Sequence, residues 1–334
     1  MSDFAASETS PARRVEDDHR IREIFFPYTD EKSIQLSSSS DARVAYYTTA
    51  ETAYHLLKNK QFWLRSPATM NDYSEVGHGF ECLKAANDSD AGKHFREALY
   101  SIFPDLTKTA VDRFYSWLPS IRQDTYIACF SEHLPSEDKN GRLSMWRAYG
   151  GRAGVALILK PVVLFAENDG IGVFASPVAY WTQSQVESEL RRIGDRVLAN
   201  CEYVRSLGRD TVEGTVFTMF KFAVLCTKHP GFAEELEWRV IASPTMYNSP
   251  LLTPAVEVVK GTPQTVQKIG LCDYPDIGLS ALKPDLLIDR IIIGPCDFPL
   301  VIWKALEQLL GDCGVENPGS RIAVSEIPLR APSA

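Results

Sequence analysis

Short segments with strand character recur along the whole chain, and helix-like segments lie between them. Residues 43–47, 61–65, 125–130 and 155–159 are rich in β-branched and aromatic side chains, which favour strands. Residues 49–60, between the first two strands, have the spacing of a helix. Strands interleaved with helices are typical of mixed architectures. The pattern therefore predicts an α+β fold with a mixed β-sheet core and flanking helices.

The pattern changes to helical spacing over residues 183–229, where few helix-breaking residues occur. We expect two helices there, separated near Gly208, as a helical insertion. Strand character returns at residues 236–242 and 290–293, and again at 322–327 after an apolar helix. No internal repeat is present. We expect one domain over residues 41–330 that carries the insertion.

The N-terminal 40 residues are rich in Ser, Ala and charged side chains, and they end in the run Ser37 to Ser40. This composition predicts a mobile leader over residues 1–40. One short apolar piece at residues 24–26 is expected to be ordered. The folded body is predicted to start at about Ala42.

Charge and cysteine usage limit the function classes. The 334 residues carry a net charge of -8, which disfavours coating of nucleic acid or anionic lipid but permits a local basic groove. The seven cysteines form no Cys-x-x-Cys pair, as expected of reduced thiols. No signal peptide is evident, and Lys221 interrupts the longest apolar stretch. We expect a cytoplasmic protein that does not contact membranes.

Two acidic residues, Glu235 and Glu237, stand two positions apart at the start of the strand predicted after the helical insertion. Residues at i and i+2 lie on one face of a strand. Such a carboxylate pair serves as a general base, as an anchor for a sugar hydroxyl, or as a stabiliser of a positive transition state. The alternative is a solvated edge strand in which Arg239 balances the acids.

Three further segments carry candidate binding residues. The polar loop with Asn71, Asp72 and Glu75 follows a strand, although Asx-turn chemistry also accounts for the first two. Ser131 stands at the end of an apolar strand, where a loop cap is the alternative role. The aromatic pair Trp146 and Tyr149 has the geometry to stack on a flat ligand or to fill the core. The residues from 66 to 149 thus supply polar and aromatic candidates.

Several common motifs are missing from the sequence. It contains no P-loop, no Gly-x-Ser-x-Gly elbow and no Gly-x-Gly-x-x-Gly sequence, which disfavours NTPases, serine hydrolases and Rossmann dehydrogenases. The six histidines have no metal-binding spacing, and although Glu51 and His55 share a helix face, no further ligand is evident nearby. Cys129 is expected to be a core thiol and not a nucleophile.

Taken in order, these segments resemble a widespread bacterial family known as domain of unknown function 2971. The resemblance covers residues 42–295. The segments that carry it are Tyr46-Tyr47, Ser66-Pro67, Asn71-Asp72 with Glu75, Cys129 to Glu132, Met145-Trp146 with Tyr149 and Gly154, Lys228 with Phe232, Glu235-Glu237-Arg239, and Ile291 to Pro295.

The layout is also distantly similar to ADP-ribosyltransferases. That similarity implies a residue on the first strand, Arg43 or Tyr46, then Ser131 or Tyr149, and then the acid pair. It implies NAD as substrate and a protein or nucleic-acid acceptor, in bacterial defence, stress or toxicity. A fixed carboxylate is suited to stabilise the oxocarbenium ion that forms when nicotinamide leaves.

The similarity to ADP-ribosyltransferases also implies individual roles. Glu237 is the expected catalytic residue, with Glu235 beside it. Tyr149 would stack on nicotinamide, and an arginine would hold the pyrophosphate. The remaining expected substrate-binding residues are Arg43, Tyr46, Asn71, Asp72, Glu75, Ser131, Trp146 and Arg239.

Two other classes of function stay open. If Asp72, Glu75, Glu235 and Glu237 converge, they are suited to gather Mg²⁺ ions for phosphodiester cleavage. Alternatively, the domain binds a nucleotide or a protein partner without catalysis, as a sensor whose contact surface is the helical insertion. Metal dependence would distinguish a nuclease from a transferase.

Overall fold

The computed structural model describes residues 11–69, 73–164, 172–259, 261–275 and 279–329. The chain forms two compact units, each assembled from three separate stretches. Unit 1 comprises Met1–Leu36, Gly77–Leu118 and Trp181–Thr227, and unit 2 comprises Ser37–Val76, Pro119–Tyr180 and Lys228–Ala334. The helical insertion expected over residues 183–229 therefore falls into a unit that also includes earlier parts of the chain.

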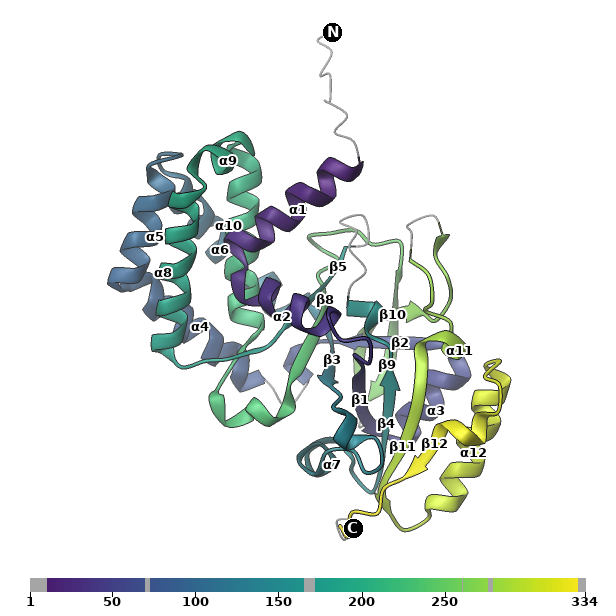
Figure 1. The fold of residues 1–334 in the computed structure, drawn as a ribbon. Coiled ribbons are helices and arrows are strands. Elements are labelled where there is room, and N and C mark those ends of the chain that lie inside the picture. The colour runs from purple at the N-terminus through teal and green to yellow at the C-terminus, as the bar shows by residue number, and fades with distance from the viewer. Residues whose placement is uncertain (1–10, 70–72, 165–171, 260, 276–278, 330–334) are drawn as a thin grey trace. The chain divides into compact units, whose positions relative to one another are not determined.

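Unit 2 contains a ten-stranded mixed sheet in the order β12-β11-β4-β1-β3-β2-β10-β9, with β8 paired to both β3 and β5 (Figure 1). Only β11 and β12 pair in parallel among the pairings described here. This mixed sheet confirms the predicted α+β class. The strands are β1 Val44–Thr49, β2 Gln61–Arg65, β3 Tyr126–Glu132, β4 Ala153–Leu159, β5 Val173–Pro177, β8 Glu237–Ala242, β9 Leu252–Val259, β10 Thr262–Gly270, β11 Ile288–Cys296 and β12 Ile322–Val324.

The sheet contains a fork, a place where strands β1 and β2 pair with opposite ends of β3 and separate between them. β1 pairs with β3 at Val44 and Ala45, opposite Glu132 and Ser131, while its whole length pairs with β4. β2 pairs with β3 where Arg65 lies opposite Ile127, and its whole length pairs with β10. Residues 128–130 of β3 therefore lie between the two pairings, where β1 and β2 have separated.

Helix α3, Ala50–Asn59, connects the two arms of the fork. It begins because the hydroxyl of Thr49 accepts a hydrogen bond from the Thr52 N–H at 3.3 Å, the usual N-cap contact. It ends at Lys60, which has a left-handed backbone with φ of 50°. Helix α12, Pro299–Asp312, packs against α3 and against β11.

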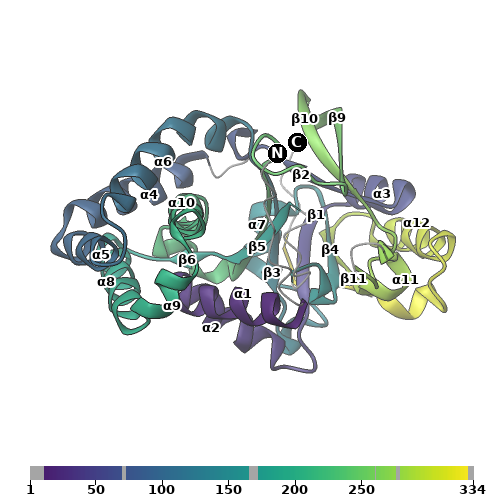
Figure 2. The same cartoon turned by 90° about the horizontal axis from the view of Figure 1, so that it is seen from above.

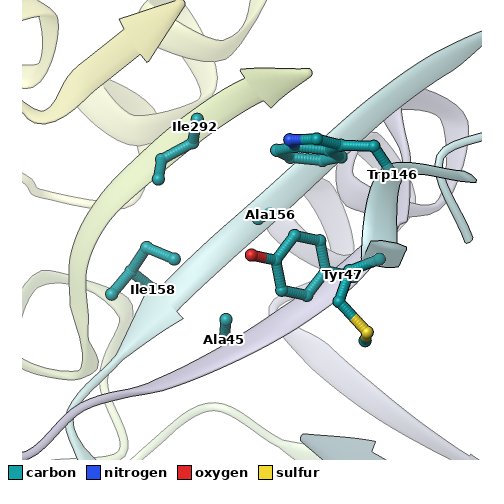
Figure 3. Packing of buried hydrophobic residues seen from close by; sticks show 7 residues of the cluster. Ala45, Tyr47, Trp146, Ala156, Ile158 and Ile292 are labelled. Carbon is teal, nitrogen blue, oxygen red and sulfur yellow. The ribbon is translucent and has the colours of Figure 1, made fainter. Parts of the chain in front are cut away.

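A buried cluster around Trp146 packs against one face of strands β1, β4 and β11 (Figure 3). Trp146 lies on α7, Leu143–Tyr149, and meets Tyr47 edge to face at a centroid distance of 4.9 Å. Its ring lies close to Gly154 and Gly294, where a Cβ atom would come within 3.0 and 2.7 Å of it. The lack of a Cβ atom at these two glycines thus permits the close approach of the Trp146 ring.

Unit 1 is helical in the part that the structure describes (Figure 2). Residues 11–37, expected to belong to a mobile leader, form two helices, and Ile24 and Phe25 are buried. Helices α5, Asp90–Tyr100, and α6, Leu106–Gln123, are separated by a break at Pro104 and at Asp105, which has φ of 62°. The helices are α1 Pro11–Phe25, α2 Pro27–Ser37, α4 Tyr73–Asp88, α5 Asp90–Tyr100, α6 Leu106–Gln123, α8 Gln183–Ala199, α9 Cys201–Ser206 and α10 Arg209–Leu225, with α4 and α6 extending beyond the unit.

Candidate functional site

A cavity of about 590 Å³ lies within unit 2, in the fork between β1 and β2. Its volume falls within the usual range for small-molecule sites. Consecutive residues of β1 and β3 line it, as expected where the edges of two diverging strands face each other. The remaining walls come from one side of α3, from β2, from β9, and from Tyr149, Glu235 and Glu237.

Both acids of the Glu-x-Glu pair reach the cavity wall and share one cation. The ammonium of Lys228 lies 2.6 Å from a carboxylate oxygen of Glu235 and 2.7 Å from one of Glu237. Arg239 contacts the other oxygen of Glu237 through its Nε at 2.8 Å. Lys228 is fully buried. Two negative and two positive charges thus form a compact, balanced cluster.

Glu235 and Glu237 do not both lie in one strand, although the sequence predicted that they would. Glu235 ends a 3₁₀ turn, Pro230–Glu235, and β8 begins only at Glu237. Leu236 between them has a left-handed backbone with φ of 45°, a conformation that costs about 1 kcal/mol for a residue with a Cβ. The turn, and not strand alternation, brings both carboxylates to Lys228.

Glu237 is held in its ionised form. It is 5% exposed, and burial alone would raise its pKa. The charges of Arg239 and Lys228, and hydrogen bonds from Arg239 and Cys129, outweigh burial and lower the pKa of Glu237 to about 2. Its backbone N–H donates to the hydroxyl of Tyr180 at 2.8 Å. The carboxylate therefore has a fixed position and a fixed charge.

Glu235 is oriented by a tyrosine. The hydroxyl of Tyr149 donates to one oxygen of Glu235 at 3.1 Å, and Lys228 holds the other. Ser131 lies opposite Glu237 in the β3–β8 pairing and also lines the cavity. This end of the cavity, which we call the acid end, therefore has two carboxylates and two hydroxyl groups within it.

Arg142 fixes the backbone that precedes the acid pair. Its guanidinium pairs with Glu137 at 2.6 Å. It also donates to the carbonyl oxygens of Glu132, Glu234 and Glu235 at 2.7, 2.7 and 3.0 Å. One side chain thus ties the end of β3 to the turn that carries Glu235, because the guanidinium offers several donors in a rigid plane.

The opposite part of the cavity is aromatic. Trp63 of β2 stacks with His55 of α3 at a centroid distance of 6.4 Å, and the ammonium of Lys268 lies 5.1 Å from the Trp63 centroid. Lys268 also pairs with Glu257 at 2.5 Å. Trp63, His55 and Glu257 all line the cavity. A flat ring bound here would find an aromatic surface.

Five of the predicted residues line the cavity: Tyr46, Ser131, Tyr149, Glu235 and Glu237. Their catalytic and binding roles stay predictions. Tyr46 packs between Phe62 and Phe130, with centroid distances of 5.3 and 5.6 Å, and burial raises the pKa of its hydroxyl.

Three predicted residues lie elsewhere. Arg43 pairs with Asp138 at 2.8 Å and with Asp289 at 3.2 Å, and it does not line the cavity. Trp146 is 3% exposed and packs in the core, so it presents no face to the cavity. Arg239 does not line the cavity but forms an ion pair with Glu237. Asn71 and Asp72 lie outside the described residues, as does the side chain of Glu75, whose backbone belongs to α4.

Sequence reasoning assigned no role to Lys228, Arg142, Arg65 or Trp63. Lys228 was noted only as part of the family pattern, and a 3₁₀ turn separates it from the acids it binds. The alternation of Gln61, Trp63 and Arg65 on one face of β2 was a usable signal, because all three line the cavity. Arg142 lies in a loop and offers no such pattern.

No group of three His, Cys, Asp or Glu side chains within the described ranges is arranged to hold a metal ion. The same ranges contain no helix whose length and apolar character would allow it to cross a membrane. Of the acidic candidates for metal binding, Asp72 and the side chain of Glu75 fall outside what the structure describes.

Comparison with known proteins supports one family. No curated protein and no solved structure matched the chain. A family model described as "Protein of unknown function (DUF2971)" matches residues 145–240. The matched segment contains Tyr149, Lys228 and both acids of the cavity. The resemblance to this family is thereby confirmed over residues 145–240.

Proposed function

We propose that the cavity of unit 2 binds NAD and cleaves its bond to nicotinamide, as an ADP-ribosyltransferase-like enzyme. The observation that carries this proposal is the acid end, where Lys228 and Arg239 hold Glu237 ionised at the wall of a ligand-sized cavity. A negative group fixed before the substrate arrives needs no reorganisation during the reaction. The distant similarity in strand layout supports the same assignment.

The proposed reaction breaks the bond between C1′ of the ribose and the nicotinamide nitrogen. The bonding electron pair leaves with nicotinamide, and the ribose becomes an oxocarbenium ion that Glu237 stabilises. An acceptor hydroxyl, from water, a protein or a nucleic acid, then attacks C1′ and gives its proton to Glu235. Tyr149 and Lys228 orient Glu235 for that transfer.

The test is nicotinamide release from NAD by the purified chain, with and without protein and nucleic-acid acceptors. Glu237→Gln keeps the shape of the side chain and removes its charge, and we expect it to lower kcat by about 10²- to 10³-fold. Glu257→Gln is the matched control, because Glu257 is also an ion-paired carboxylate that lines the cavity. Nicotinamide release that Glu237→Gln leaves unchanged would contradict the proposal, as would no release with any acceptor.

A second candidate is a sensor that binds a nucleotide without cleaving it. The compensation of both carboxylates by cations favours this role, because a neutralised acid stabilises a positive transition state less than an isolated one. In that case NAD binds without turnover, and Glu237→Gln changes affinity alone. A setting in bacterial defence or stress, as a toxin or a defence component, fits either role and stays a prediction.

The geometry supports a magnesium-dependent nuclease least. The ammonium of Lys228 occupies the position between Glu235 and Glu237 that a shared divalent ion would take. A second cation placed there would be repelled at close range. Nuclease activity that depends on Mg²⁺ and on Glu237 would favour the nuclease over the other two functions.

A further inference from the structure

Arg65 differs from the other buried or half-buried cations around the cavity. Lys228, Arg239, Arg142 and Lys268 each pair with at least one carboxylate. In the described ranges, no carboxylate lies within ion-pair distance of Arg65. Within these ranges its guanidinium makes long hydrogen bonds to neutral oxygens, 3.5 Å to the Gln264 side chain and 3.4 Å to the Thr69 carbonyl. A half-buried guanidinium without an anion is unfavourable unless a ligand supplies one.

The position of Arg65 directs its charge into the cavity. Arg65 shares one face of β2 with Trp63 and Gln61, and all three residues line the cavity. Burial lowers the pKa of Arg65, and the nearby side chains of Tyr46 and Cys129 carry no charge in their ordinary protonated forms. The guanidinium keeps its charge nonetheless, because its ordinary pKa is far above neutral.

Arg65 is separated from the acid end along β3. Arg65 lies opposite Ile127, whereas Ser131 lies opposite Glu237. Four residues of strand correspond to about 13 Å. A ligand that reaches both places must therefore be elongated, with its anionic part at β2 and its reacting part at the acid end.

We propose that Arg65 is the phosphate-binding residue of the cavity and that the ligand is a nucleoside diphosphate or a molecule that contains one. This inference rests on the proposed nucleotide site and adds where the phosphates bind. A guanidinium matches phosphate oxygens with two parallel hydrogen bonds. Trp63, stacked with His55 on the same wall, supplies the surface for the base.

The experiment is calorimetric titration of the full chain with adenosine, ADP, ADP-ribose and inorganic pyrophosphate. None of these contains the nicotinamide bond, so binding is measured apart from cleavage. We expect ADP and ADP-ribose to bind at least tenfold more tightly than adenosine. Arg65→Met should weaken the binding of ADP by about tenfold to a hundredfold and leave the affinity for adenosine unchanged. The ADP affinity of Arg65→Lys should fall between those of the unmodified chain and Arg65→Met, because lysine keeps the charge but loses the planar set of donors.

Arg191→Met removes an exposed arginine of unit 1 and serves as the matched control, with no expected change in ADP affinity. ADP binding no tighter than adenosine in the unmodified chain would overturn the inference, whatever the stability of the variants. An equal loss of affinity for ADP and for adenosine in Arg65→Met would also overturn the inference. ADP-ribose binding that depends on Arg65, without any cleavage of NAD, would support this inference while contradicting the proposed enzyme.

Discussion

At the scale of single residues, the acid end depends on one lysine. Lys228 contacts both Glu235 and Glu237, and neither carboxylate is well exposed to water. A buried ion pair adds little net stability, but removal of one partner leaves an uncompensated charge and costs several kcal/mol. The cluster therefore behaves as a unit, in which the effect of each substitution depends on the charges left behind.

Replacement of Lys228 should destabilise the protein strongly. We expect Lys228→Met to lower the free energy of unfolding at pH 7 by about 3 to 5 kcal/mol, measured by urea unfolding. Lys221→Met is the control, because Lys221 is equally buried but burial lowers its pKa to about 8, which shows that its surroundings disfavour the charge. We expect Lys221→Met to be neutral or stabilising. Equal losses in the two variants would contradict a special role for Lys228.

The ionised state of Glu237 predicts a dependence of stability on acid pH. Its pKa falls from an ordinary 4.5 to about 2 in the folded protein. A lowered pKa stabilises the folded state above the unfolded pKa, and this contribution disappears as the pH falls through the folded pKa. The contribution is about 3 kcal/mol, so Glu237→Gln should lose about that much at pH 7.

The measurement is urea unfolding of both proteins at pH 7, 4.5, 3 and 2. The difference between them should be full at pH 7, slightly smaller at pH 4.5, and should shrink towards pH 2. Glu257→Gln is a control on the same cavity, with a carboxylate that is more exposed at 30%. A difference that is the same at pH 7 and pH 2 would show that the charge of Glu237 does not cause it.

At the scale of elements, α3 forms part of the cavity wall and has defined signals at both ends. It ends at Lys60, an exposed residue with φ of 50°, a position that glycine adopts without strain. We expect Lys60→Gly to raise the free energy of unfolding by about 0.5 to 1 kcal/mol. Lys58→Gly, two residues earlier within the helix, should lower it by a similar amount.

The two variants make a matched pair, because each replaces an exposed lysine by glycine. Thermal and urea unfolding would give opposite signs for them. A loss of stability in both variants would mean that Lys60 contributes more through its side chain than the left-handed backbone costs.

Elements with a strong local pattern could be predicted from the sequence. Strands β1 and β2 and helix α3 occur at nearly the predicted positions. The hairpin of β9 and β10 was missed, because the polar and exposed residues of β9 lack a clean alternation. The break between α5 and α6 was also missed, although Pro104 was a local signal for it.

At the scale of the whole molecule, contacts between distant parts of the sequence make the candidate site. The fork requires that β1 and β2 both pair with β3 and then diverge, and no local pattern encodes such a register. The acid pair was found because its two members are close in sequence. Lys228 and Arg142 gain their roles only from tertiary structure, so their roles were beyond a pattern-based prediction.

The division into two units gives a prediction for the complete chain. A ligand that binds only the native cavity stabilises that region by about 2.7 kcal/mol at a concentration of 100 Kd. Hydrogen exchange with saturating ADP should therefore slow in β1, β2, β3 and α3 of unit 2, whose residues line the cavity or frame the fork. Helices α5 and α8 belong to unit 1 and should exchange at unchanged rates.

The same exchange experiment on Arg65→Met separates ligand protection from a general effect of ADP. At an ADP concentration that saturates the unmodified chain, the variant should lose most of the protection in β2 and β3, because its affinity is lower and the cavity is less occupied. Arg191→Met should retain the full pattern. Protection of α5 and α8 equal to that of β1 would contradict binding confined to unit 2, and protection unaffected by Arg65→Met would place the phosphates elsewhere.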